Sequence, residues 1–328
     1  MRRKFAVWQL ATILLATVSI AQAQQPGRVP RIAILLPGID GGPQSPSRAP
    51  FEAGLRKLGW IPGQNLIIER RFAGGKLDRL PEMAAELIRL PVDAILASGP
   101  AVHVAKDATR TIPIIMTFGT DDPVEAGFVT SLAHPGSNIT GVVTLAPEVG
   151  GKRLELLKAT IPTVTRVAVL SWPGRSSMSQ MKEIEVAAQS LGVRLQVLEV
   201  SDTTGYESAF LTMRKQGSKA FIVLSSSVYF GDRRRIIELA TKHRVPLMAP
   251  FREYAEDGGL MAYGPNIPEL WGERVPLYVD KILKGTKPAD FPVEQPTKFE
   301  FIINLKAAKQ IGVTIPPNVL ARADRVIR

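Results

Sequence analysis

The chain has 328 residues, of which 45% are hydrophobic, and 41 Lys and Arg against 30 Asp and Glu give it a formal net charge of +11. It contains no cysteine, which excludes disulfides, thiolate metal sites, cysteine nucleophiles and a lipid-modified cysteine behind a signal sequence. A chain of this length can bury enough apolar surface for two domains without covalent cross-links.

The N-terminus has the three parts of a cleaved export signal. Basic residues 2–4 precede an apolar run over residues 5–20, and Ala21-Gln22-Ala23 supplies the small residues of a cleavage site. We predict a signal peptide over residues 1–23, cleavage after Ala23 and a mature protein in the periplasm. A permanent membrane anchor is the alternative, but the run is short for a membrane span and contains Gln9. Both the general secretory and the twin-arginine export routes remain open.

The positive charge belongs partly to this signal. Removal of residues 1–23 takes away three basic side chains and no acidic one, which leaves 38 basic against 30 acidic side chains, or +8. The tightest basic run, Arg233-Arg234-Arg235, has no aromatic residues interleaved with it. Nucleic-acid binding usually needs a clustered basic footprint and a recognisable module, so we expect no nucleic-acid partner and read the run as a solvated helix face.

Strands and helices alternate from residue 31 onward. After a polar linker over residues 24–30, a continuous apolar run at residues 31–36 is typical of a strand buried on both faces. Phe51, Leu55 and Leu58 recur at helical spacing. This alternation predicts a parallel sheet covered by helices on both faces. The following predicted elements are a strand at 65–69, a helix at 77–90, a strand at 93–97, a helix at 101–109 and a strand at 112–116.

The second half of the chain repeats this scheme. Four segments recur in the same order at offsets of 126 to 135 residues, beginning with residues 31–38, which correspond to residues 166–174. We therefore predict two lobes with the same βαβ topology. The other three correspondences pair Leu58-Gly59 with Leu191-Gly192, residues 93–99 with 219–226, and residues 112–116 with 245–249.

Two similar lobes create a cleft between them. Ligands of open parallel sheets bind beyond the carboxyl ends of the strands, and two such edges facing across a hinge can close over a solute. The candidate ligand-binding residues are therefore those that follow strand ends. They are Ser98, Gly99, Ala101, Thr117, Asp121, Thr144, Trp172, Ser225, Ser226, Tyr229 and Tyr263.

Each candidate also has an ordinary structural interpretation. Ser98-Gly99-Pro100 opens a helix whose free N–H groups would attract a carboxylate, or it simply caps that helix. Asp121 could pair with a ligand ammonium or cap a turn. Trp172 could stack on a ring or pack at the hinge, and the hydroxyls of residues 225–229 could bond a ligand or belong to common loop chemistry. Tyr263, near a return crossover, has the same two interpretations.

Enzymatic motifs are missing from the chain. It contains no GxSxG elbow, GxGxxG turn, GxxxxGK[ST] loop or HExxH helix, and its three histidines lie far apart. Acid–base chemistry by Asp121, Asp122 and Glu125 remains possible in principle. We expect no catalytic residues, no metal and no cofactor.

Eleven short segments spread over the mature chain resemble the family of ABC-transporter substrate-binding proteins that includes tryptophan- and tyrosine-type binders. Together they are specific for the family but not for the ligand. They are residues 54–60, 63–65, 78–81, 112–114, 122–124, 135–141, 152–157, 250–253, 258–264, 295–300 and 303–306.

The resemblance implies a type I periplasmic-binding fold. It also implies ligand contacts at Ser98, Gly99, Thr117, Asp121, Ser226 and their neighbours. Residues 37–43 depart from the family pattern, because they are rich in Gly and Pro and carry Asp40 where relatives often have a serine-containing loop. This loop should form one wall of the cleft, so the aromatic amino-acid specificity of the relatives does not transfer directly.

We therefore predict two Rossmann-like α/β lobes joined by a hinge, with crossovers near residues 145, 262 and 290. The N-terminal lobe comprises residues 31–144 and about 263–290, and the C-terminal lobe residues 145–262 and about 291–328. The predicted function is that of a monomeric periplasmic protein that captures an amino acid or related small carboxylate and delivers it to an ABC permease. A ligand-sensing subunit of a membrane receptor and an exported hydrolase or lyase are the alternatives.

Overall fold

The computed structural model describes residues 28–39, 42, 45–118, 122–144, 148–173, 175–202 and 204–328. The predicted signal peptide, Asp40 and Asp121 lie outside these residues. No helix in the described ranges is both long enough and apolar enough to cross a membrane.

The first sheet is parallel and has the strand order β2-β1-β3-β4-β5. Side chains on one of its faces pack against α3 and α4, and those on the other face pack against α2 and α12. The continuous apolar composition of β1 and β3 follows from this cover on both faces. The elements are β1 (Arg31–Leu36), α2 (Arg48–Lys57), β2 (Ile67–Phe72), η1 (Leu77–Arg79), α3 (Leu80–Arg89), β3 (Ala94–Ser98), α4 (Pro100–Ala108), β4 (Ile114–Phe118) and β5 (Ile139–Gly141).

A late segment of the chain returns to this sheet. It comprises α11 (Ile267–Glu269), the π-helical η2 (Leu270–Arg274) and α12 (Val275–Leu283), followed by η3 (Pro288–Asp290), and it packs on α2 and β4. A Cβ at Gly54 would lie 2.1 Å from the Gly272 carbonyl oxygen, so glycine allows the two helical segments to touch. We call this sheet with its helices the first lobe.

The second sheet has the order β12-β11-β10-β9-β8-β6-β7, and only the β10–β11 pairing is antiparallel among the described strands. Helices α5 and α6 cover one face, and α7 and α9 cover the other. We call this sheet with its helices the second lobe. Its elements are α5 (Glu148–Thr160), β6 (Arg166–Ser171), α6 (Arg175–Leu191), β7 (Arg194–Glu199), α7 (Tyr206–Lys215), β8 (Ala220–Val223), α8 (Ser227–Gly231), α9 (Arg233–Lys242), β9 (Leu247–Ala249), α10 (Arg252–Glu256), β10 (Met261–Pro265), β11 (Phe299–Asn304), α13 (Leu305–Ile311), α14 (Pro317–Leu320) and β12 (Arg325–Ile327).

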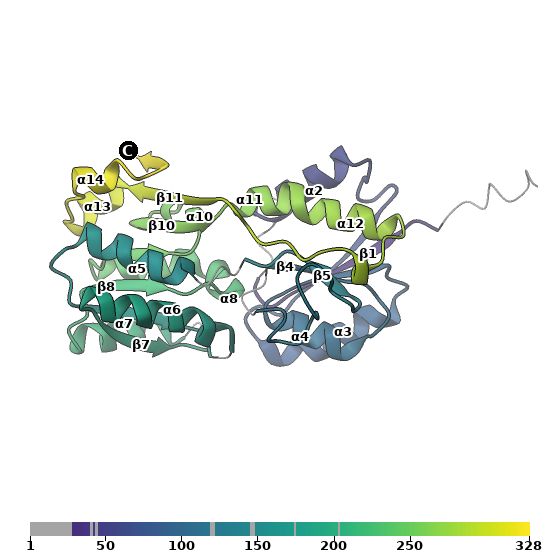
Figure 1. Ribbon diagram of the computed structural model, residues 1–328, viewed down its shortest axis with the longest axis horizontal. Coiled ribbons are helices and arrows are strands. Elements are labelled where there is room, and N and C mark those ends of the chain that lie inside the picture. The colour runs from purple at the N-terminus through teal and green to yellow at the C-terminus, as the bar shows by residue number, and fades with distance from the viewer. Residues whose placement is uncertain are drawn as a thin grey trace, which may run out of the picture.

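The two lobes lie side by side and are joined by three passages of the chain (Figure 1). These passages follow β5, follow β10 and precede β11. The first and third are bonded to each other, because Val143 N donates to Glu294 O at 3.0 Å and Glu294 N donates to Gly141 O at 3.0 Å. In the second passage Asn266 accepts from Glu269 N at 2.9 Å and donates to Glu300 Oε1 at 2.8 Å. Asn266 therefore ties a helix of the first lobe to a strand of the second.

The predicted fold class is confirmed, with two α/β sheets flanked by helices. Three of the four echoed segments are equivalent strands, since β1 and β6 occupy the same place in their sheets, as do β3 and β8, and β4 and β9. The predicted strand at 65–69 is displaced to Ile67–Phe72, where every residue is half-buried because β2 is an edge strand. Tyr263 lies within β10, and the chain leaves the second sheet only after Pro265.

Glu253 on α10 is a buried carboxylate, with 3% of its surface exposed. Neither of its oxygens has a hydrogen-bond partner among the described residues, and Arg252 Nε lies 3.8 Å from Oε1. Burial raises the pKa of Glu253 from 4.5 to about 7. Ionised Glu253 therefore costs stability at neutral pH.

This cost predicts a pH-dependent stability. The native state keeps the Glu253 proton up to about pH 7, whereas the unfolded chain releases it near pH 4.5, so the native state binds more protons between these values. The free energy of unfolding should therefore fall as the pH rises through this interval, by roughly 3 kcal/mol from this group. Urea unfolding at pH 5 and pH 8 should show that Glu253→Gln removes this part of the fall. Glu238, whose side chain is 68% exposed, provides the control Glu238→Gln. An unchanged pH dependence in Glu253→Gln would contradict the assignment.

Candidate functional site

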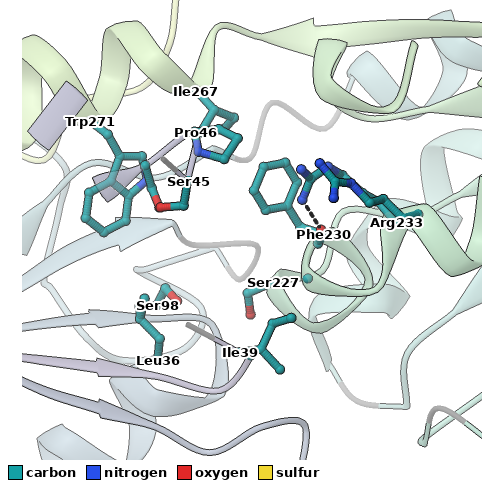
Figure 2. Close-up of a pocket in the computed structure, with 14 residues that line it drawn as sticks. Leu36, Ile39, Ser45, Pro46, Ser98, Ser227, Phe230, Arg233, Ile267 and Trp271 are labelled. Carbon is teal, nitrogen blue, oxygen red and sulfur yellow. Dashed lines mark hydrogen bonds between the residues drawn. The ribbon is translucent and has the colours of Figure 1, made fainter. Parts of the chain in front are cut away.

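A cleft of about 540 Å³ lies between the lobes at the carboxyl ends of β1 and β3 (Figure 2). The first lobe contributes the end of β1, the loop before α2, the last residue of β3 and the returning segment α11–η2. The second lobe contributes α8 and the start of α9. The lining residues are Leu36, Gly38, Ile39, Ser45, Pro46, Ser47, Ser98, Ser227, Phe230, Gly231, Arg233, Arg234, Ile267 and Trp271.

The lining combines aromatic and aliphatic surface with hydroxyl groups. Trp271 and Phe230 project from opposite lobes in Figure 2, with Ser45, Ser98 and Ser227 around the same space. Ser45 Oγ accepts from Arg48 N at 3.0 Å and so is partly used by the start of α2. The hydroxyls of Ser98 and Ser227 make no hydrogen bond to the described part of the chain. They are therefore available to a polar solute.

Two arginines stand at the second-lobe side of the cleft. Arg233 Nε lies 2.8 Å from Asp257 Oδ2, and Arg233 Nη1 donates to Phe230 O at 3.0 Å. Its guanidinium lies 4.9 Å from the centroid of the Phe230 ring, which helps to fix that ring. Arg234 is 80% exposed and lies 3.5 Å from the same carboxylate of Asp257. The described lining contains no Asp or Glu, so the charge of the cleft wall is positive.

Glycines let the two lobes approach each other at the cleft. A Cβ at Gly38 would lie 3.1 Å from Ser227 O, and one at Gly99 would lie 3.3 Å from Ser227 Oγ. Gly99 also has a φ of +50°, which L residues rarely adopt. A Cβ at Gly231 would make an ordinary contact, 3.4 Å from Ile39 Cγ1. The loops after β1 and β3 therefore lie against α8 almost without intervening side chains.

Two of the sequence-predicted residues come together here. Ser98 lines the cleft, and Gly99 lies beside Ser227. Ser226, next to them in the second lobe, uses its hydroxyl to accept from Val228 N at 3.2 Å and Tyr229 N at 3.4 Å. Ser226 thus acts as the N-cap of α8.

Other predicted residues contact the protein itself and are not part of the described cleft lining. Tyr229 is fully buried and its hydroxyl donates to Val200 O at 2.8 Å. Trp172 packs edge-on against that ring, with centroids 5.6 Å apart. Thr117 is fully buried and donates to Ala97 O at 3.3 Å. Ser225 N donates to Gln180 Oε1 at 2.8 Å, and Ala101 is fully buried in α4.

The remaining predicted residues lie away from the described cleft lining. Tyr263 faces an outer groove between α5, α6 and the β10–β11 pair, where its ring centroid is 6.0 Å from that of Phe299. Thr144 is 7% exposed in the first passage between the lobes. Asp121 is outside the described residues.

Several lining residues were not predicted from the sequence. Phe230 is only one residue beyond Tyr229, and its place one helical turn after Ser226 could have indicated it. Trp271 and Ile267 come from the returning segment, and Ser45 and Ser47 from the loop before α2. Nothing local in the sequence places Trp271 beside β1, because its position depends on the packing of η2 against α2.

The glycine contacts predict that added bulk will block closure. Gly38→Val should push the loop after β1 away from Ser227, since overpacking of this kind costs about 1–3 kcal/mol. Small-angle scattering should show a larger radius of gyration, and the affinity for any bound solute should fall roughly tenfold. Gly231→Ala is the matched control, because its Cβ fits. If Gly38→Val bound and closed like the parent protein, this contact would not limit closure.

Comparisons with known proteins agree with this geometry. The family model described as "ABC transporter substrate binding protein" matches residues 38–327. The tyrosine-binding protein of Clostridioides difficile is 25% identical over 265 residues, which are 80% of this chain and 75% of that protein.

Two solved structures share the arrangement of both lobes. A conserved domain protein of Vibrio cholerae has a TM-score of 0.83 and 26% identity, and the match covers 91% of this chain and all of that one. The ABC domain of Streptococcus pneumoniae in complex with L-Trp has a TM-score of 0.81 and 25% identity, covering 92% of this chain and all of that one. The predicted type I periplasmic-binding fold is thereby confirmed.

Proposed function

Because this chain belongs to the family of ABC transporter substrate-binding proteins, we propose that its interlobe cleft captures an amino acid or a related small carboxylate with an apolar or aromatic group. The single observation that supports this ligand class best is the pairing of Trp271 and Phe230 across a cleft that also has free hydroxyls from both lobes. The relatives that are described with tyrosine and L-Trp support an aromatic solute.

Capture needs no chemical step. The apolar part of the solute would lie against Trp271, Phe230 and Ile267, where its burial supplies most of the binding energy. Its polar groups would bond to the hydroxyls of Ser98 and Ser227, one from each lobe. A solute that bridges the lobes favours the closed form, because it interacts fully only with that form.

The positive charge of the cleft wall favours a solute with an anionic group. Arg233 and Arg234 make the wall positive and would attract an anion during association. An amino acid also brings an ammonium group, for which the described lining offers no carboxylate. Asp40 and Asp121, beyond the ends of β1 and β4 in sequence, are the residues we propose for this group if the solute is an amino acid.

We place the mature protein in the periplasm after removal of residues 1–23. The basic n-region, the apolar run and Ala21-Gln22-Ala23 support this export. The closed form would then deliver its solute, as a monomer, to the permease of an ABC importer. Membership of the family supports this role over that of a receptor subunit or an exported hydrolase.

A thermal-shift panel with the mature protein tests the ligand class. Aromatic amino acids or aromatic carboxylates without an amine should raise the Tm saturably, since a ligand that binds only the native state stabilises it. Phe230→Ala should weaken that ligand about tenfold through lost aromatic contact and burial. The matched control is Phe299→Ala, because Phe299 lines the outer groove. Stabilisation by sugars alone would contradict the proposal.

A further inference from the structure

Arg153 on α5 is a buried cation outside the cleft lining described above. Only 4% of its surface is exposed. Its Nε donates to Tyr263 O at 2.8 Å, and its Nη2 lies 3.5 Å from where a Cβ of Gly264 would be. Burial lowers the pKa of Arg153 to about 10, so the side chain remains charged at neutral pH.

This charge has no counter-ion in the described part of the chain. No carboxylate there lies within 4.0 Å of the Arg153 guanidinium, and the Tyr263 carbonyl is its one hydrogen-bond acceptor among these residues. A guanidinium offers five N–H donors, and a buried charge without a partner destabilises the native state. Arg233, by contrast, lies 2.8 Å from Asp257. A bound anion would therefore supply a partner that Arg153 lacks among the described residues.

Arg153 lies near the edge of the second sheet that faces the cleft. Strands β9 and β10 run parallel to β8 and β6, so all four carboxyl ends lie on one edge. That is the edge where Ser227, beyond β8, meets Gly38 and Gly99 of the first lobe. Gly264 stands near the end of β10, and the second passage between the lobes starts two residues later.

The position of Arg153 near the start of α5 directs its side chain toward this edge. Side chains of an α-helix tilt toward its N-terminus, and the N-terminus of α5 follows the first passage between the lobes. Gly264 keeps the neighbouring backbone close, because a Cβ there would lie 1.7 Å from Pro250 O. Arg153 thus lies at the hinge end of the edge that faces the first lobe.

We propose that Arg153 binds the carboxylate of the captured solute, as a bidentate anion site at the hinge end of the interlobe cleft. This inference rests on the proposed function. A carboxylate matches the planar guanidinium fork and would supply the missing negative charge. The site would make the protein prefer acids over uncharged analogues of the same shape.

The test compares Arg153→Met with the parent protein in the absence and presence of benzoate, acetate and the uncharged benzamide. The parent protein should be stabilised by benzoate and acetate beyond equal concentrations of chloride, and it should bind benzoate at least tenfold more tightly than benzamide. Arg153→Met should have an equal or higher Tm without ligand, because it removes an unpaired buried charge. It should lose the anion response, which is the rise in Tm on addition of benzoate or acetate. It should also lose the preference for benzoate over benzamide.

Matched variants complete the design. Lys152→Met removes a neighbouring, 41%-exposed cation of α5 and should change nothing. Arg153→Lys should keep part of the anion response. A lower Tm of ligand-free Arg153→Met with the anion response intact, or no anion response in the parent protein, would overturn the site. If acetate acts through Arg153 while no amino acid or aromatic acid binds, the anion site stands and the proposed solute class fails.

Discussion

The direction of the strands is the constraint on which the rest of this protein depends. Strands β1, β3, β4 and β5 run parallel in one sheet, and β6, β8, β9 and β10 run parallel in the other. Each sheet therefore gathers its strand-to-helix loops on one edge, and the chain passages turn these edges toward each other. Ser98 and Ser227, 129 residues apart, line one cleft for this reason. Gly38 then lies against the backbone of Ser227, and Gly99 lies against its side-chain hydroxyl.

The passages between the lobes are held together by hydrogen bonds. Two of them bond to each other through Val143 and Glu294, and the third carries Asn266, whose amide contacts both lobes. The same arrangement inserts α11–α12 into the first lobe late in the chain. Trp271 thereby joins residues of β1 and β3 in the cleft, with its ring 5.7 Å from that of Phe51. Hinge and binding surface are thus built from the same segment.

Much of the fold could be predicted from the sequence, and rather little of the cleft lining. Unbroken apolar runs such as residues 31–36 indicate strands buried on both faces, and their echo at residues 166–171 indicates a second lobe. Ser98 could be predicted because a residue at the carboxyl end of a parallel strand must lie at the edge of the sheet where ligands bind. The direction of a side chain beyond a strand end, however, depends on tertiary partners: the Tyr229 ring is buried, and its hydroxyl donates a hydrogen bond to Val200 O. Trp271 could not be placed at all, since its position follows from helix packing across more than 200 residues.

The most direct test of the account is a crystal structure of the mature protein with a solute that stabilises it. The solute should lie between the lobes, with its ring or aliphatic part among Trp271, Phe230 and Ile267 and its polar groups on the hydroxyls of the facing edges. A solute seated instead in the outer groove of Tyr263 and Phe299, with the interlobe cleft filled only by water, would contradict it.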